Sequence, residues 1–218
     1  MSCAICSDRK EKRFCLAVHG RICPQCCGEQ RELTLDCPSE CPYLQQARQH
    51  QKPRPLEGAP PEEVFPQIDL SDEFLRDRVP VISGILHTIG RLAGSDRSLT
   101  DREAIAALAN LAKSYQTLVG SGLVYEQMPP SLAQQALIAA VRQLLEEFRQ
   151  LEREHLGHTT LRDAEVLKVL VLVLRLAHIH TSGRPRSRGF LDFVDRQFRK
   201  ARSAIAAADE PESRIIMT

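Results

Sequence analysis

The first 41 residues hold a cluster of thiols whose types and spacing suit metal binding. All eight cysteines of the 218-residue chain lie in this stretch: Cys3, Cys6, Cys15, Cys23, Cys26, Cys27, Cys37 and Cys41. The pairs Cys3-x2-Cys6 and Cys23-x2-Cys26 have the spacing of zinc-binding knuckles. So short a segment buries too little apolar surface to fold unaided, and a bound metal ion would supply the missing stability.

The start of the chain indicates a compartment in which these thiols stay reduced. Its first residues, Met-Ser-Cys-Ala-Ile-Cys, contain no apolar stretch of signal-peptide length, so we expect a cytoplasmic protein. Zinc is therefore favoured over disulfides and over an iron–sulfur cluster. Eight thiolates fill two tetrahedral Zn²⁺ sites and leave no position for a reactive water, which predicts structural zinc and no catalytic residue there.

The adjacent pair Cys26 and Cys27 indicates how the thiols divide between the two ions. Neighbouring side chains point in divergent directions, so these two sulfurs are expected to bind different ions. We assign Cys3, Cys6, Cys23 and Cys26 to the first Zn²⁺, and Cys15, Cys27, Cys37 and Cys41 to the second. The spacing Cys15-x3-His19 also suits a metal site, so His19 is an alternative ligand in place of Cys27.

Two short signatures carry a resemblance to known zinc proteins. The run Cys-Pro-Gln-Cys-Cys-Gly at residues 23–28 resembles the knuckle of treble-clef zinc folds, with a turn at the glycine. The pair Cys37-x3-Cys41 leads into an expected helix with a proline in its first turn. The whole chain also looks like a group of uncharacterised bacterial proteins with the signatures CPxCCG and CPxxCxYL, a resemblance that implies a metal-binding module but no activity.

The composition changes after the cysteine-rich module and divides the chain into four parts. Prolines and acidic residues dominate the stretch that follows the module, as in an extended linker. We predict a binuclear zinc module at residues 1–52, a proline-rich linker at 53–68, a helical-bundle domain at 69–207 and a C-terminal tail at 208–218. The apolar Ile-Ile-Met in the tail favours docking onto the domain.

Apolar residues at helical spacing predict a mostly α protein with a bundle of about five helices. The first covers residues 75–89, and the second begins at a capping box, Thr100-x-x-Glu103, and ends at Gly120. Ser131 caps the third. The fourth, residues 160–180, is apolar on nearly every side and is therefore the central helix, while its charged residues argue against a membrane span. The fifth covers residues 188–207.

Arginines crowd the start of the fifth helix. Residues 183–203 hold seven basic and two acidic residues, whereas residues 56–182 and 204–218 together hold thirteen basic and twenty acidic ones. Positive side chains are unfavourable at a helix N-terminus, which is the positive end of the helix dipole, unless an anion binds both to the arginines and to the helix end. We therefore identify Arg184, Arg186, Arg188 and Arg199 as candidates for binding an anion or a partner. The alternative is that they pair with acidic groups of the same molecule.

These features predict an intracellular adaptor or regulatory protein, stabilised by zinc and without catalytic activity, that binds a protein partner. One alternative is a nucleic-acid-binding regulator that uses the basic segments 9–13 and 184–202. Residues 1–55 hold nine basic and six acidic residues, a formal charge of +3. Eight thiolates and two Zn²⁺ change this net charge to about −1, so the metal-loaded module would attract phosphate groups poorly. The other alternative is an enzyme with a pocket at Tyr125, Glu126 and Arg184, although no phosphate loop, nucleophile elbow or dinucleotide fingerprint is present.

Overall fold

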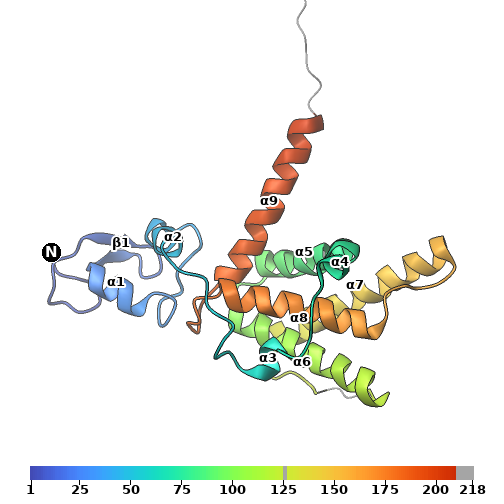
Figure 1. Ribbon diagram of the computed structural model, residues 1–218. Helices are drawn as coiled ribbons and strands as arrows, with labels where there is room; N and C mark the ends of the chain where they lie inside the picture. The colour runs from blue at the N-terminus through green and yellow to red at the C-terminus, as the bar shows by residue number, and fades with distance from the viewer. Residues whose placement is uncertain (125–126, 210–218) are drawn as a thin grey trace, which may run out of the picture.

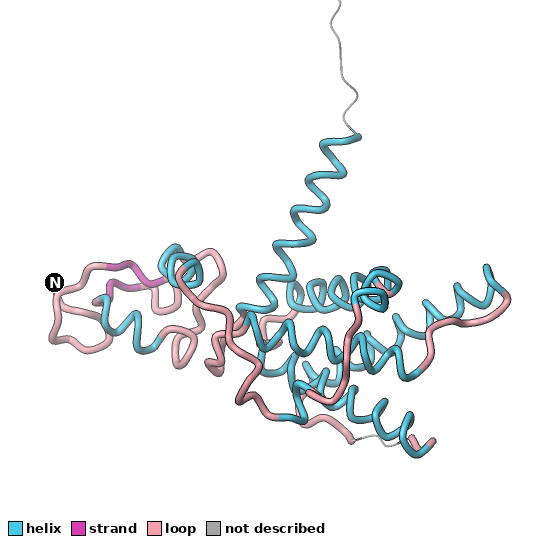
Figure 2. Tube along the Cα trace, in the orientation of Figure 1, coloured by secondary structure: helices cyan, strands magenta, loops and turns pink. Residues whose placement is uncertain are grey.

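The computed structural model describes residues 1–124 and 127–209, with side chains up to residue 199. The described chain is mostly helical, with a small cysteine-rich part at the N-terminus and one short two-stranded sheet, which confirms the predicted fold class (Figures 1 and 2). Tyr125, Glu126 and the tail residues 210–218 lie outside the described residues. Within the described part, no helix is long and apolar enough to cross a membrane.

The cysteine-rich module contains one hairpin and two helices. Strands β1 (Arg13–Cys15) and β2 (Gly20–Ile22) pair antiparallel, and α1 (Pro24–Gln30) and α2 (Pro42–Gln49) follow. Each helix begins with a proline after a cysteine, because proline lacks the N–H that would have no partner in a first turn. The helix expected after Cys41 is confirmed. The turn expected at Gly28 is absent, since this glycine lies inside α1, whose first turn occupies the predicted knuckle.

In the part of the chain that the structure describes, the bundle contains a short helix and five long ones. These are α4 (Asp72–Asp77), α5 (Val79–Ser95), α6 (Asp101–Ser121), α7 (Leu132–Leu156), α8 (Asp163–His180) and α9 (Gly189–Asp209). Both predicted cap hydroxyls accept their N–H bonds: Thr100 from Glu103 at 3.3 Å and Ser131 from Gln134 at 3.2 Å. The second half of the predicted capping box is not seen, because the Glu103 carboxylate accepts bonds from the Ser131 hydroxyl and the Gln134 amide instead. Helix α6 is capped at its C-terminus by Gly122 rather than by Gly120, because Gly122 has the left-handed φ of 72°.

Helix α8 lies at the centre of the bundle, as its apolar sequence predicts. It packs against α6, α9, α5 and a short helix α3 (Pro61–Val64). Val169, Leu170 and Val173 have no exposed surface. Each such side chain contributes roughly 1.5–3 kcal/mol through burial. The first turns of α9 are also buried, and the helix then extends away from the body of the bundle (Figure 1).

The stretch predicted as a linker, residues 53–68, is packed against the bundle at its C-terminal end. Helix α3 lies in it, and the side chains of Val64 and Phe65 join the bundle core. From α8, the Arg175 guanidinium donates hydrogen bonds to the carbonyls of Val64 at 2.9 Å and of Phe65 and Ile68 at 2.7 Å. These bonds fix the path of the chain from the module to the bundle.

Candidate metal centre

Four cysteines of the module form a compact cluster of sulfur atoms. The Sγ atoms of Cys3, Cys6, Cys23 and Cys26 all lie within 4.8 Å of one another. Zinc with four Zn–S bonds of about 2.3 Å holds its sulfurs about 3.8 Å apart, so the cluster is close to the size of such a site. These are the four residues assigned to the first ion. Three of them are buried and Cys6 is half-buried.

The local backbone explains why these four side chains meet. Cys3 and Cys6 flank an N-terminal turn closed by a hydrogen bond from the Ser7 N–H to the Cys3 carbonyl at 2.8 Å. The hairpin then returns the chain, so that Cys23 caps α1 and Cys26 lies in its first turn. The Cys23 sulfur accepts the Cys26 N–H at 3.3 Å, the capping bond of α1. Turn, hairpin and helix start thus place the two pairs opposite each other.

Hydrogen-bond donors surround the sulfurs as they would surround thiolates. The Cys23 N–H donates to the Cys3 sulfur at 3.2 Å, and the Arg9 guanidinium donates to the Cys26 sulfur at 3.3 Å. Burial alone would raise the pKa of Cys3, but N–H bonds from Cys6, Cys23 and Ile5 lower it to about 6.

Deprotonating several of these four thiols at once is unfavourable unless a cation is bound among them. Arg9 lowers the pKa of Cys26, but burial and the neighbouring Cys23, Cys6 and Cys3 outweigh it and raise that pKa to about 12. A bound metal ion removes this conflict, because its positive charge allows all four sulfurs to be deprotonated together. The soft, all-sulfur donor set fits zinc or iron and excludes hard ions such as Mg²⁺ and Ca²⁺.

The other four cysteines gather around a second point in the module. Cys15, Cys27, Cys37 and Cys41 line one cavity of about 10 Å³. Burial raises the pKa of Cys37, and the nearby Cys15 and Cys41 raise it further. The guanidinium of Arg13 approaches the Cys27 sulfur at 3.5 Å. Among the described residues, however, only the first group has all its sulfurs within 4.8 Å. His19 is exposed in the hairpin turn and does not line this cavity.

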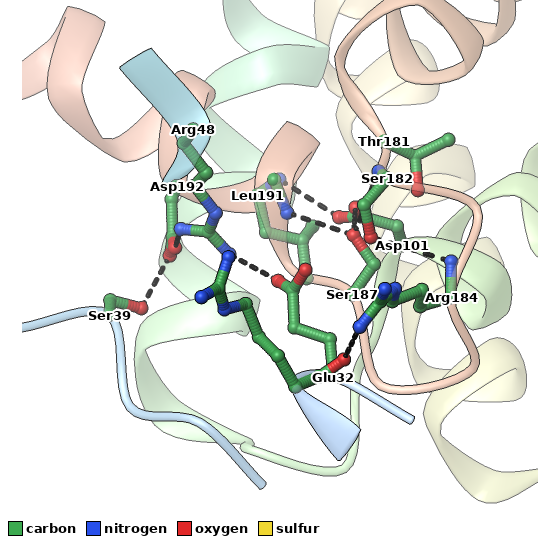
Figure 3. A network of polar contacts seen from close by, with 12 residues as sticks. Glu32, Ser39, Arg48, Asp101, Thr181, Ser182, Arg184, Ser187, Leu191 and Asp192 are labelled. Atoms are coloured by element: carbon green, nitrogen blue, oxygen red, sulfur yellow. Dashed lines mark hydrogen bonds and ion pairs between the residues drawn. The ribbon is translucent and has the colours of Figure 1, made fainter. Parts of the chain in front are cut away.

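An ion-pair network joins the module to the start of α9. From α2, the Arg48 guanidinium contacts Glu32 at 2.7 Å and also pairs with Asp192, while the Ser39 hydroxyl donates to Asp192 at 2.7 Å (Figure 3). Only 12%, 4% and 15% of the side chains of Arg48, Glu32 and Asp192 are exposed. Burial lowers the pKa of Arg48, but the two carboxylates raise it more strongly, so the guanidinium stays charged.

The loop between α8 and α9 completes the junction of module and bundle. The Arg184 guanidinium donates to the Gly28 carbonyl at 3.0 Å and also reaches the Arg31 carbonyl, at the end of α1. On the bundle side, the buried Asp101 carboxylate accepts bonds from the Ser187 hydroxyl at 2.7 Å and from the first N–H groups of α9 (Figure 3). The acid therefore caps α9 and holds the loop that carries Arg184.

The arginines identified in the sequence occupy separate settings. Arg184 binds carbonyls of the module, and Arg186 has an exposed side chain. Arg188 is buried and donates to the carbonyls of Leu99 and Ala93. Arg199 pairs with Asp195 on its own helix at 2.7 Å.

Sequence reasoning missed Glu32, Arg48 and Asp101 as parts of the junction. Only for Asp101 was there a local signal, since it follows the Thr100 cap, but nothing indicated that it would cap a helix almost 90 residues away.

Comparison with protein-family models, with curated proteins and with solved structures gives no match. The fold and the site therefore define the class: a mostly helical protein whose cysteine-rich N-terminal module contains a four-cysteine cluster that can hold a metal ion.

Proposed function

We propose that this protein is a non-catalytic adaptor in which a zinc-stabilised module is fixed to a helical bundle that binds a protein partner. The first Zn²⁺ is bound by Cys3, Cys6, Cys23 and Cys26. The second is bound by Cys15, Cys27, Cys37 and Cys41, which line one cavity of about the size of a water molecule. The order of turn, hairpin and helix supports a treble-clef module.

The donor chemistry supports a structural role for both ions. Catalytic zinc keeps one position open for water or substrate, whereas two sets of four thiolates complete both coordination shells. Reduced thiols are needed for this binding, and all eight cysteines are unpaired with one another. We therefore place the protein in a reducing compartment such as the cytoplasm.

The observation that carries the adaptor proposal is a set of exposed apolar side chains in and beside the connection between α6 and α7. It consists of Val119, Leu123, Val124, Met128 and Leu132, and the last four are 67–84% exposed. We call this set the apolar loop surface. Large exposed apolar side chains concentrated in one short stretch of the chain suit a site that another protein covers.

The adaptor proposal is tested by purifying the tagged full-length protein from the cells that produce it and quantifying what accompanies it. The test variant is Leu123→Ser with Met128→Ser. The matched control is Leu151→Ser with Leu156→Ser, which removes two leucines that are 54% and 57% exposed near the other end of α7. We expect a protein that accompanies the wild type and the control in stoichiometric amount and is lost from the test variant. Equal loss from both variants, or no such protein at all, contradicts the proposal.

The zinc part is tested separately by elemental analysis and native mass spectrometry of protein purified without added metal. We expect two Zn²⁺ per chain. A single ion would remove the second site from the proposal, and iron would replace the assigned metal.

The two alternative functions have less support from the described residues. For a nucleic-acid-binding regulator, Arg9 and Arg13 would have to contact phosphates, yet both guanidiniums are directed at cysteine sulfurs. For an enzyme, Tyr125 and Glu126 lie outside the described residues, and Arg184 is occupied by carbonyls of the module.

A further inference from the structure

A basic cavity lies where the module, the start of the linker and the α8–α9 loop meet. It has a volume of about 380 Å³, and we call it the junction cavity. Its charged lining consists of Arg31, Arg48, Lys52, Arg54 and Arg184 together with a single acid, Glu32. Because Glu32 is paired with Arg48, the other four cations have no carboxylate in the lining.

Two of these cations lack any partner in the described part of the chain. Neither the Lys52 ammonium nor the Arg54 guanidinium forms a hydrogen bond or an ion pair with a described residue. Arg54 is nevertheless held in place. The backbone N–H of Arg54 donates to the Ile179 carbonyl at 3.1 Å. Its guanidinium lies so close to Gly183 that a Cβ at residue 183 would be 2.5 Å from the Arg54 Nη1 atom. Gly183 has a φ of 74°, which favours glycine and permits this approach.

The remaining cations are positioned by the module. Arg184 is anchored to the carbonyl of Gly28, and Arg31 lies 3.8 Å from the Cys27 sulfur. Arg31 and Arg184 thus already have partners, a sulfur and two carbonyls, whereas Lys52 and Arg54 line the same hollow without one, and an anion between them would relieve their repulsion. Arginine and lysine in this arrangement are the groups that proteins use for phosphate oxygens.

We propose that the junction cavity binds a compact phosphorylated ligand, such as a diphosphate. Lys52 and Arg54 supply the unpaired positive charge for such a ligand, and the volume falls within the range of small-molecule sites. A nucleic-acid strand fits less well, because no aromatic side chain lines the cavity to stack on a base, and Leu44 and Ala47 are its apolar lining residues. The site is independent of the apolar loop surface and of the protein partner proposed for it.

The test is calorimetric titration of the metal-loaded full-length protein with inorganic pyrophosphate at low ionic strength. The test variant is Lys52→Gln with Arg54→Gln. The matched control is Lys12→Gln with Arg76→Gln, which removes the same formal charge from two exposed side chains with no partner among the described residues. We expect the test variant to bind pyrophosphate about tenfold or more weakly than the wild type, and the control to bind it within about twofold.

Three results would overturn the proposal. The first is that the wild type does not bind pyrophosphate. The second is that both variants lose affinity equally, which would indicate attraction by general charge. The third is that a single-stranded oligonucleotide binds in a manner that depends on Lys52 and Arg54 while pyrophosphate does not, which would assign the cavity to nucleic acid. Thermal unfolding and zinc content of both variants establish that any loss is not a folding defect.

Discussion

Replacing Arg48 with alanine should open the junction between the metal-binding module and the bundle. The substitution leaves the carboxylates of Glu32 and Asp192, which are 4% and 15% exposed, without their shared cation. Removal of one partner from such a buried group costs about 3–5 kcal/mol, because the remaining charges stay desolvated. We expect a destabilisation of this size, which is a large part of the total stability of a typical domain.

The chain offers a control at the same junction. Arg97 in the bundle faces Asp36 in the module at 3.9 Å, and both side chains are more than half exposed. An exposed pair of this kind contributes about 0–1 kcal/mol, so Arg97→Ala should have little effect. A triple variant, Glu32→Gln, Arg48→Met and Asp192→Asn, removes the whole charge set and should recover at least half of the loss caused by Arg48→Ala.

The assay combines urea unfolding of the metal-loaded protein with hydrogen exchange followed by mass spectrometry. For Arg48→Ala we expect a lower free energy of unfolding and faster exchange in α2 and in the α8–α9 loop, with α6 and α8 unchanged. If Arg48→Ala were no more harmful than Arg97→Ala, the junction would not depend on this network. Recovery in the triple variant separates the cost of unpaired charge from a simple loss of packing.

Three further predictions concern the metal sites, pH and the anion site. Cys23→Ser should reduce the zinc content from two ions to one by elemental analysis, whereas Cys27→Ser should remove the other ion and leave the first. Burial raises the pKa of Glu152, but bonds from Thr160, Thr159 and the Leu161 N–H outweigh it and lower the pKa to about 2. The ionised Glu152 therefore stabilises the folded state fully above about pH 4.5, and this contribution is lost as the pH falls towards 2. In urea unfolding, the difference in the free energy of unfolding between the wild type and Glu152→Gln should shrink over that pH interval. Removing the metal with a strong chelator should abolish pyrophosphate binding in calorimetry, since the module supplies part of the junction cavity.

The helices of the bundle could be predicted from the sequence, because the capping residues and apolar patterns that specify them lie within or next to each helix. The Ser131 hydroxyl caps a helix by accepting the N–H of the residue three positions later, which depends only on the local sequence. The run of apolar residues in α8 is stable only where other helices surround it. The grouping of Cys3, Cys6, Cys23 and Cys26 also followed from short spacings and from the divergence of adjacent side chains. The two strands were missed because three residues are too few to show a period of two.

The junction could not be predicted, because its partners are far apart in the sequence. Arg48 and Asp192 are separated by 144 positions, and each in isolation is an ordinary charged residue at the end of a helix. The arginines near residue 184 show the same dependence on tertiary packing. Their density indicated an anion or partner site, or pairing within the molecule, and the structure places Arg188 against carbonyls of the bundle and Arg184 against the module. Composition reveals that charge is concentrated, whereas the direction of each side chain depends on tertiary packing.

The two proposed binding sites should differ in their dependence on the metal. Cys27 belongs to α1, whose end supplies the Gly28 and Arg31 carbonyls that anchor Arg184, so a wall of the junction cavity is built on a residue of the second thiol group. The apolar loop surface lies at the far end of α6, which starts at the junction with Asp101 and runs for 21 residues, about 30 Å at 1.5 Å per residue. Loss of metal should therefore dismantle the proposed anion site directly, while the proposed partner surface lies on a bundle to whose core the cysteines contribute nothing.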